Sequence, residues 1–129
     1  MAYEIPVFCH SFTAAADLSD KQFHFVKLTA NDTINVCDAV TDVPVGVLQD
    51  APEAGQAAEV MLVGISKVSS DAALTAGNLI GTSADGQADA KVAGTDTTNY
   101  VVGQVLSGTG AAGELATVAI NTLNPHRGA

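Results

Sequence analysis

The sequence predicts a mainly β fold: a small single-domain β-barrel or β-tulip-like fold built around two related β-hairpin units. Glycine or proline interrupts the apolar runs within about ten residues, as in chains of short strands and turns. No apolar stripe with a period of about 3.6 residues continues beyond about two turns, so at most one short helix fits, within residues 13–21 or 70–76. The intervening runs are rich in Val, Ile and Thr, which favour strands.

Each expected strand follows from its local pattern and from the turn residues that end it. Alternation favours a strand at 22–28, the turn residues Ala-Asn-Asp follow it, and a second short strand comes next. The run AEVMLVGISKV is apolar on both faces, which is typical of a strand covered on both sides. The dipeptide Asp85-Gly86 indicates a hairpin turn, and the polar stretch 88–98 is expected to lie on the surface. The expected strands are 22–28, 33–37, 43–48, 58–68, 100–106 and 115–120.

The chain ends are expected to differ from the β domain at 21–123. Residues 1–20 combine apolar side chains with Pro6, which leaves two alternatives open: an extended N-terminal arm or an ordinary first strand of the domain's own sheet. An arm of this kind could add a strand to an exposed sheet edge on a partner. Residues 124–129 form a short tail.

A duplication explains a motif that otherwise suggests a cofactor. Gly108, Gly110 and Gly113 have the spacing G-x-G-x-x-G, which in a strand–loop–helix unit binds a dinucleotide. The segment 100–113 aligns with 43–55, however, and that earlier copy fills its loop with Asp, Pro and Glu instead of three glycines. A dinucleotide site also needs a helix after the third glycine, whereas residues 115–120 are β-like. The motif is therefore interpreted as a hairpin loop.

Bulk properties exclude several classes of partner. The formal net charge of −9 disfavours binding to nucleic acid, and no segment is apolar for the length of a membrane span. The first residues lack the basic start of a secretory signal, so Cys9 and Cys37 are expected as free thiols of a protein made in a reducing cytoplasm, with one bridge as the alternative. The core lacks Trp and is dominated by Ala and Val, so subunit contacts are expected to add burial.

No pattern of chemically active side chains points to catalysis. His10, His24 and His126 are scattered, the serines do not fit G-x-S-x-G, and the carboxylates stand singly beside turns. Lys67 lies inside a strand-like run, unlike the hairpin-tip lysine of a biotin or lipoyl carrier. We therefore expect a protein that is not an enzyme, with no cofactor and no metal.

The order of the motifs resembles a family of small virion proteins of tailed phages. The segments are PVGVLQDAPEAGQAAEVMLVG at 44–64, LTAGNLIGTSADGQA at 74–88 and YVVGQVLSG at 100–108. Over about residues 20–122 the chain is similar to capsid cement or decoration proteins. The TAG and VGQVL pieces are also similar to lambda-type head decoration proteins, whose β-tulip fold forms trimers.

The resemblance implies a non-enzymatic protein of the outer capsid surface, made in the host cytoplasm. It implies a homotrimer at threefold and quasi-threefold positions whose partner is the major capsid protein. The charge and hydropathy described above add the expectation of no nucleic-acid and no membrane contact. The expected capsid-contact residues lie in the N-terminal segment: Tyr3, Ile5, Pro6, Val7 and Phe8. The alternative is a head-fibre or adhesin-type module whose loop at 82–99 contacts host surface glycans; only two Tyr and no Trp are present for stacking on sugars.

Overall fold

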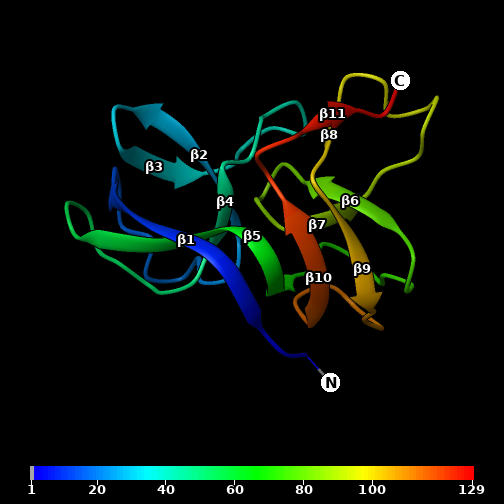
Figure 1. Ribbon diagram of the computed structural model, residues 1–129, viewed down its shortest axis with the longest axis horizontal. Coiled ribbons are helices and arrows are strands. Elements are labelled where there is room, and N and C mark those ends of the chain that lie inside the picture. The colour runs from blue at the N-terminus through cyan, green and yellow to red at the C-terminus, as the bar shows by residue number, and fades with distance from the viewer. Residues whose placement is uncertain (1) are drawn as a thin grey trace.

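The computed structural model describes residues 2–129 and confirms the all-β prediction: none of these residues lies in a helix (Figure 1). The described residues accordingly contain no helix that could cross a membrane. The strands are β1 (Ile5–Ala14), β2 (Phe25–Ala30), β3 (Thr33–Val36), β4 (Gly46–Leu48), β5 (Ala57–Ser69), β6 (Leu79–Thr82), β7 (Ala88–Ala90), β8 (Tyr100–Val101), β9 (Gly103–Ser107), β10 (Leu115–Asn121) and β11 (His126–Arg127).

The strands form one large sheet and one small one. The large sheet has nine strands in the order β1-β3-β2-β4-β5-β10-β9-β6-β7, and β1 also pairs with β5. The small sheet joins β8 to β11, so the C-terminal tail is held against the domain. The longest strand, β5, lies in the middle of Figure 1, with β1 to β4 on one side and β6 to β10 on the other.

The two hairpins that align in the sequence also pair in the same register. In the first hairpin Leu48 of β4 lies opposite Val60 of β5, and in the second Val105 of β9 lies opposite Val118 of β10. These four residues are equivalent in the sequence alignment. The sequence duplication is therefore a structural duplication.

The duplication extends well beyond these hairpins. The hairpin β2–β3 matches β6–β7, and the pairing of β1 with β5 matches the pairing of β5 with β10. The matched registers are Val26↔Val36 with Ile80↔Ala90, Leu28↔Ile34 with Thr82↔Ala88, and Thr13↔Ala57 with Ser69↔Leu115. We call β1 to β4 with the first half of β5 (residues 5–63) unit A, and the second half of β5 with β6, β7, β9 and β10 (residues 63–121) unit B.

Each unit closes a ring of strands, and β5 belongs to both rings. In unit A, β1 pairs with β3 on one side and with β5 on the other. In unit B, a bridge from Ser70, directly after β5, to Ala88 of β7 closes the equivalent ring. The two units are thus related copies joined through one continuous strand.

The two units also have matching cores. Nearly every buried residue of the unit A core has a buried apolar equivalent in the unit B core, so the same inward positions are apolar twice. The equivalent pairs are Phe12 and Val68, Leu18 and Leu74, Val26 and Ile80, Ile34 and Ala88, Leu48 and Val105, Ala58 and Ala116, Val60 and Val118, and Leu62 and Ile120.

Two local predictions are wrong. Residues 22–24 belong to a turn instead of a strand: Phe23 has φ 64°, the amide of His24 donates to the carbonyl of Lys21, and β2 begins at Phe25. The stretch expected on the surface at 88–98 starts with β7, and Ala88 in it is fully buried. In both places the tertiary contacts override the local polarity pattern.

The N-terminal segment is paired for most of its length. Residues 5–14 form β1, which runs antiparallel to β5, so of the two alternatives the structure has a strand of the domain's own sheet. Pro6 lies opposite Gly64, and a bulge follows it, because Phe8 lies opposite Val63. Gly64 has φ 139°, and a Cβ there would lie 2.7 Å from the carbonyl oxygen of Ile5. This glycine therefore allows the two strands to approach closely.

Candidate functional site

The glycine motif forms the loop between β9 and β10, and its shape has a purely structural explanation. A Cβ at Gly108 would overlap the carbonyl of Leu74, and Gly113 has a positive φ of 85°. The loop amides of Gly110 and Ala111 both donate to Oε1 of Glu114, at 2.7 and 3.2 Å. The place where a phosphate would accept these bonds is thus filled by the chain's own carboxylate.

The histidines lie apart, as their positions in the sequence suggest. Nε2 of His10 is 4.0 Å from Oδ1 of Asp32, Nδ1 of His24 is 3.1 Å from the carbonyl of Gln22, and His126 lies in β11. Within residues 2–129, no three His, Cys, Asp or Glu side chains come together in a way that could hold a metal ion.

Lys67 lies inside β5, where the sequence pattern places it. Its Nζ is 3.5 Å from Oε1 of Glu4 and 5.6 Å from the centre of the Phe23 ring. The lysine thereby connects the residue before β1 to the turn before β2. This is the environment of a structural ion pair, and it differs from the exposed hairpin tip of a carrier lysine.

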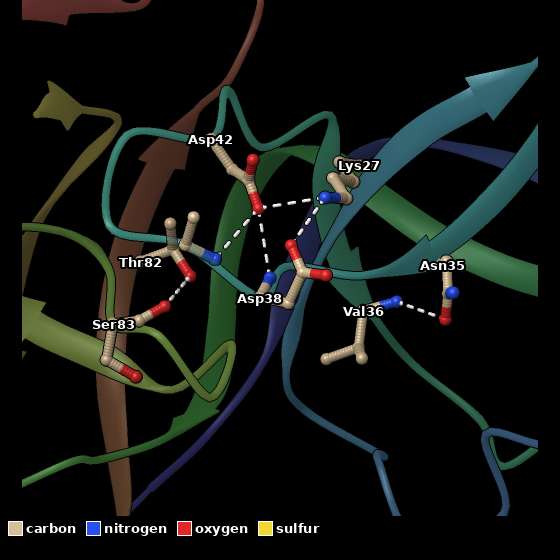
Figure 2. A network of polar contacts seen from close by, with 8 residues as sticks. Lys27, Asn35, Val36, Asp38, Asp42, Thr82 and Ser83 are labelled. Carbon is tan, nitrogen blue, oxygen red and sulfur yellow. Dashed lines mark hydrogen bonds and ion pairs between the residues drawn. The ribbon is translucent and has the colours of Figure 1, made fainter.

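A polar network in unit A fixes the loop that follows β3 (Figure 2). Nζ of Lys27 donates to Asp38 at 2.6 Å and to Asp42 at 3.1 Å. Oδ2 of Asp42 also accepts the amides of Asp38 and Ala39. Burial would raise the pKa of Asp42, but these hydrogen bonds and the Lys27 charge outweigh it and lower the pKa. The pKa of Lys27 is raised, and the hydrogen bond to Asp38 is the main cause.

Unit B repeats part of this network. Oδ2 of Asp96 accepts the amide of Val92, as Asp42 accepts that of Asp38. The lysine of unit B lies elsewhere: Lys91 is only 5 % exposed, and its Nζ contacts Asp89 at 3.0 Å and Asn99 at 2.8 Å. The loops after β3 and β7 are therefore stabilised in related ways.

Both cysteines are free thiols. Burial raises the pKa of Cys37 to about 12, so its thiol stays protonated. Burial, with the nearby charges of Glu59 and Glu4, also raises the pKa of Cys9. Neither thiol is activated, because an activated thiol has a lowered pKa.

The predicted contact residues lie together at the start of the chain and are all exposed. Their exposed fractions are Tyr3 44 %, Ile5 54 %, Val7 74 % and Phe8 48 %, and Pro6 is also exposed. The amide of Tyr3 donates to Oγ1 of Thr117 in β10, which fixes this segment against unit B. We call these five residues the β1 surface. They form an apolar edge on an otherwise acidic chain.

One further feature, which the sequence did not predict, is a cavity of about 340 Å³ at the end of unit B. It lies where β6, β9 and β10 meet the C-terminal tail. Its lining includes Leu79, Val101, Gly103, Gln104, Ala119 and His126. The cavity could have been located from the sequence only by recognising the complete duplication. The one sequence signal for that duplication beyond the hairpins is the dipeptide Thr-Asp, which occurs at 41–42 and again at 95–96.

Comparison with known proteins identifies a structural neighbour. No protein-family model matches the sequence, and no curated protein matches it. The chain is similar to a solved structure described as the head fiber gp8.5 N base of bacteriophage phi29, with a TM-score of 0.67 and 18 % sequence identity. The similarity covers 89 % of this chain and 94 % of that one, and at this identity it shows a shared fold.

Proposed function

We propose that this chain is a structural protein of a phage head that acts as a decoration, or cement, protein. In this proposal it binds the major capsid protein on the outer surface of the shell, as a homotrimer at threefold and quasi-threefold positions. It performs no catalysis and needs no cofactor. Its action is to stabilise the assembled lattice, because a ligand that binds only the assembled form shifts the equilibrium toward that form.

The observation that carries the proposal is the fold shared with the head fibre N base over nearly the whole of both chains. That neighbour is itself a component of a phage head, and the motif order of this chain independently resembles phage decoration proteins. Fold alone does not imply function, so the test must address the contact itself.

The β1 surface is the proposed contact with the shell. Its side chains are apolar and exposed, and its strand is held in place by β5, so docking would order little of the backbone. The chain as a whole has a net charge of −9, and this charge disfavours association between copies on different particles. An apolar edge on such a chain is where a protein partner gains most by excluding water.

The test is binding to shells that lack this protein. Purified chain is mixed with such shells, and both the occupancy and the temperature of shell disruption are measured. A Val7→Ser/Phe8→Ser variant should lose occupancy, whereas the matched control Val92→Ser/Leu106→Ser, at two other exposed apolar residues, should bind normally. Failure of the natural chain to bind, or binding without added heat resistance, contradicts the cement function.

A head-fibre or adhesin-type module that contacts host glycans is the second candidate, and the identity of the neighbour favours it. Sugar rings stack on exposed aromatic side chains. Tyr3 is 44 % exposed, whereas Tyr100 is partly covered and lies beneath Arg127, whose guanidinium carbon is 5.7 Å from the ring centre. Binding to a glycan array that Tyr3→Ala abolishes would support this function over cementing.

A further inference from the structure

The junction between the two units shows how one unit binds another. The tip of the β6–β7 hairpin of unit B packs against unit A, and Thr82 and Ser83 in it are 1 % and 4 % exposed. The carbonyl of Gly86 accepts the amide of Phe25 at 2.6 Å. A Cβ at Gly86 would lie 2.6 Å from Cγ2 of Val36. A hairpin tip of one unit thus docks on β2 and β3 of the other.

The surface of unit A that takes part in this junction is apolar and fully covered. Phe25, Val47 and Met61 are at most 1 % exposed, although they lie outside the unit A core. They belong instead to the core of unit B, together with Ile80 and Ala88. Their burial therefore results from contact with the second unit.

In the part of the chain that the structure describes, the equivalent surface of unit B is not covered by another unit. The equivalents of Phe25, Val47 and Met61 are Leu79, Gln104 and Ala119, by the registers that match the two units. Leu79 is 40 % exposed, Gln104 is exposed and Ala119 is half-buried. All three line the cavity of about 340 Å³. The cavity thus occupies the place where, in unit A, the next unit docks.

The equivalent hairpin tip of unit A is also uncovered. Leu28, which corresponds to the buried Thr82, is 53 % exposed, and residues 29–32 are exposed as well. Asp32 corresponds to Gly86, and both have a positive φ. We call residues 28–32 the free tip. One molecule therefore displays both halves of the junction that it builds internally.

The charges of the two free halves are complementary. The free tip carries Asp32, whose side chain is 83 % exposed although its Oδ1 lies 4.0 Å from Nε2 of His10. The cavity is bordered by His126, and the exposed Arg127 follows it in β11. Arg127 is the chain's one arginine among only five basic residues, against 14 acidic ones. A second copy that brings Asp32 to this rim would place an acidic tip beside one of the few basic positions.

We propose that the free tip of one copy packs into the cavity of a second copy, in a head-to-tail contact that repeats the junction between unit A and unit B. A head-to-tail contact is heterologous, so it produces a finite assembly only by closing into a ring. This contact would join the subunits of the trimer in the proposed function. The inference rests on that function only for the number of subunits in the ring. Gln104 and Asp32 make the contact more polar than the internal junction, so we expect association that depends on concentration.

The test uses two variants, each of which removes one half of the contact. Leu28→Asp disables the free tip and leaves the cavity intact, whereas Ala119→Arg blocks the cavity and leaves the tip intact. The control is Leu106→Asp, a 41 % exposed apolar residue of β9 outside the cavity lining. Masses are measured by sedimentation equilibrium over a wide range of concentration, and thermal unfolding establishes that each variant is folded.

We expect the natural chain and the control to associate, and each variant alone to be a monomer. A mixture of the two variants should form 1:1 heterodimers, because one contributes a tip and the other a cavity. If Ala119→Arg fails to fold, Gln104→Arg replaces it. A monomeric natural chain at every concentration, variants that keep its mass, or a mixture without heterodimers would each overturn the proposal.

The result is separate from the test of capsid binding. A chain that associates as described but ignores shells would refute the cement function and leave the contact standing. A chain that binds shells as a monomer would refute the contact and leave the function standing.

Discussion

The duplicated glycines of β4 and β9 offer the sharpest test of the fold. Gly46 and Gly103 occupy the same register in the two hairpins, each beside the strand that follows. A Cβ at Gly46 would overlap the carbonyl oxygen of Met61, and a Cβ at Gly103 would lie 2.6 Å from that of Ala119. Neither glycine has a positive φ, so the crowding alone requires a glycine. We expect Gly46→Ala and Gly103→Ala to destabilise the protein similarly.

The size of the destabilisation depends on which atoms must move to accommodate the new Cβ. Overpacking costs about 1–3 kcal/mol, and the upper end applies because the obstacle is backbone, which a rotamer change cannot displace. At about 2.1 cal/mol/K per residue, the 129 residues give an unfolding entropy of about 0.27 kcal/mol/K. A loss of about 3 kcal/mol therefore lowers Tm by about 11 °C.

Thermal unfolding at one fixed protein concentration measures this effect, with two other glycines as controls. Gly55 has φ 81° with open space around it, so Gly55→Ala should cost only the left-handed penalty of about 1 kcal/mol, or about 4 °C. Gly110 has neither constraint, and its alanine variant should melt within about 2 °C of the natural chain. If Gly46→Ala also melted within that margin, the close approach of β4 and β5 would not constrain the fold.

The remaining predictions concern the polar groups. Lys27→Met should cost about 1.5 kcal/mol in urea unfolding, since a charged hydrogen bond is lost. The lowered pKa of Asp42 means that the network contributes above the ordinary pKa of an aspartate and fails as pH falls through the lower folded value; the raised pKa of Lys27 means that it fails again in strong alkali. The cost should therefore be largest between about pH 5 and pH 9, and a constant cost from pH 2 to pH 11 would refute this account. Cys37 should react with a thiol reagent at pH 8 only as the protein unfolds, and more slowly than Cys9; equal rates would show that burial does not protect it. Lys91→Met should cost about 2 kcal/mol, because it leaves the Oδ1 atom of the buried Asn99 without its donor; unchanged unfolding would show that water replaces the ammonium group.

The sequence predicts the hairpin duplication because its cause is local. Gly46 and Gly103 must be glycine for the same steric reason. The residues opposite each other in the two hairpins, Leu48 with Val60 and Val105 with Val118, must be apolar because they face a core. Positions with one strong physical requirement stay similar in both copies, and these are the positions that a sequence alignment detects. The strands at 58–68 and 115–120 were predicted within about a residue at each end for the same reason.

The rest of the duplication could not be predicted, since equivalent positions meet different surroundings. Leu28 is exposed at a free tip, whereas its equivalent Thr82 is buried at the junction, so the two tips have opposite polarity patterns. Phe23 and its equivalent Gly77 both have a left-handed backbone conformation. A glycine indicates such a turn in the sequence, whereas a phenylalanine gives no sign of it. The residues that differ between the two units are therefore those whose surroundings differ between the two positions in the molecule.

The duplication also explains how a core with few large side chains can bury enough apolar area to stabilise the fold. The two units share β5, so that one 13-residue strand supplies core residues to both: Val60 faces the core of unit A, while Val68 and Met61 face that of unit B. A strand used twice buries more area than two separate strands of half its length, which would each leave an open edge. Within residues 2–129 the sharing does not extend to the outer strand of either unit: no other strand pair covers β1 as unit B covers β4 and β5, and none covers the cavity beside β10. Ile5 illustrates this at the first end, because it is 54 % exposed where its equivalent Met61 is 1 % exposed. The two open ends are therefore a direct consequence of building a domain from two units, and they are where contact with other protein surfaces can complete the burial that the chain itself leaves unfinished.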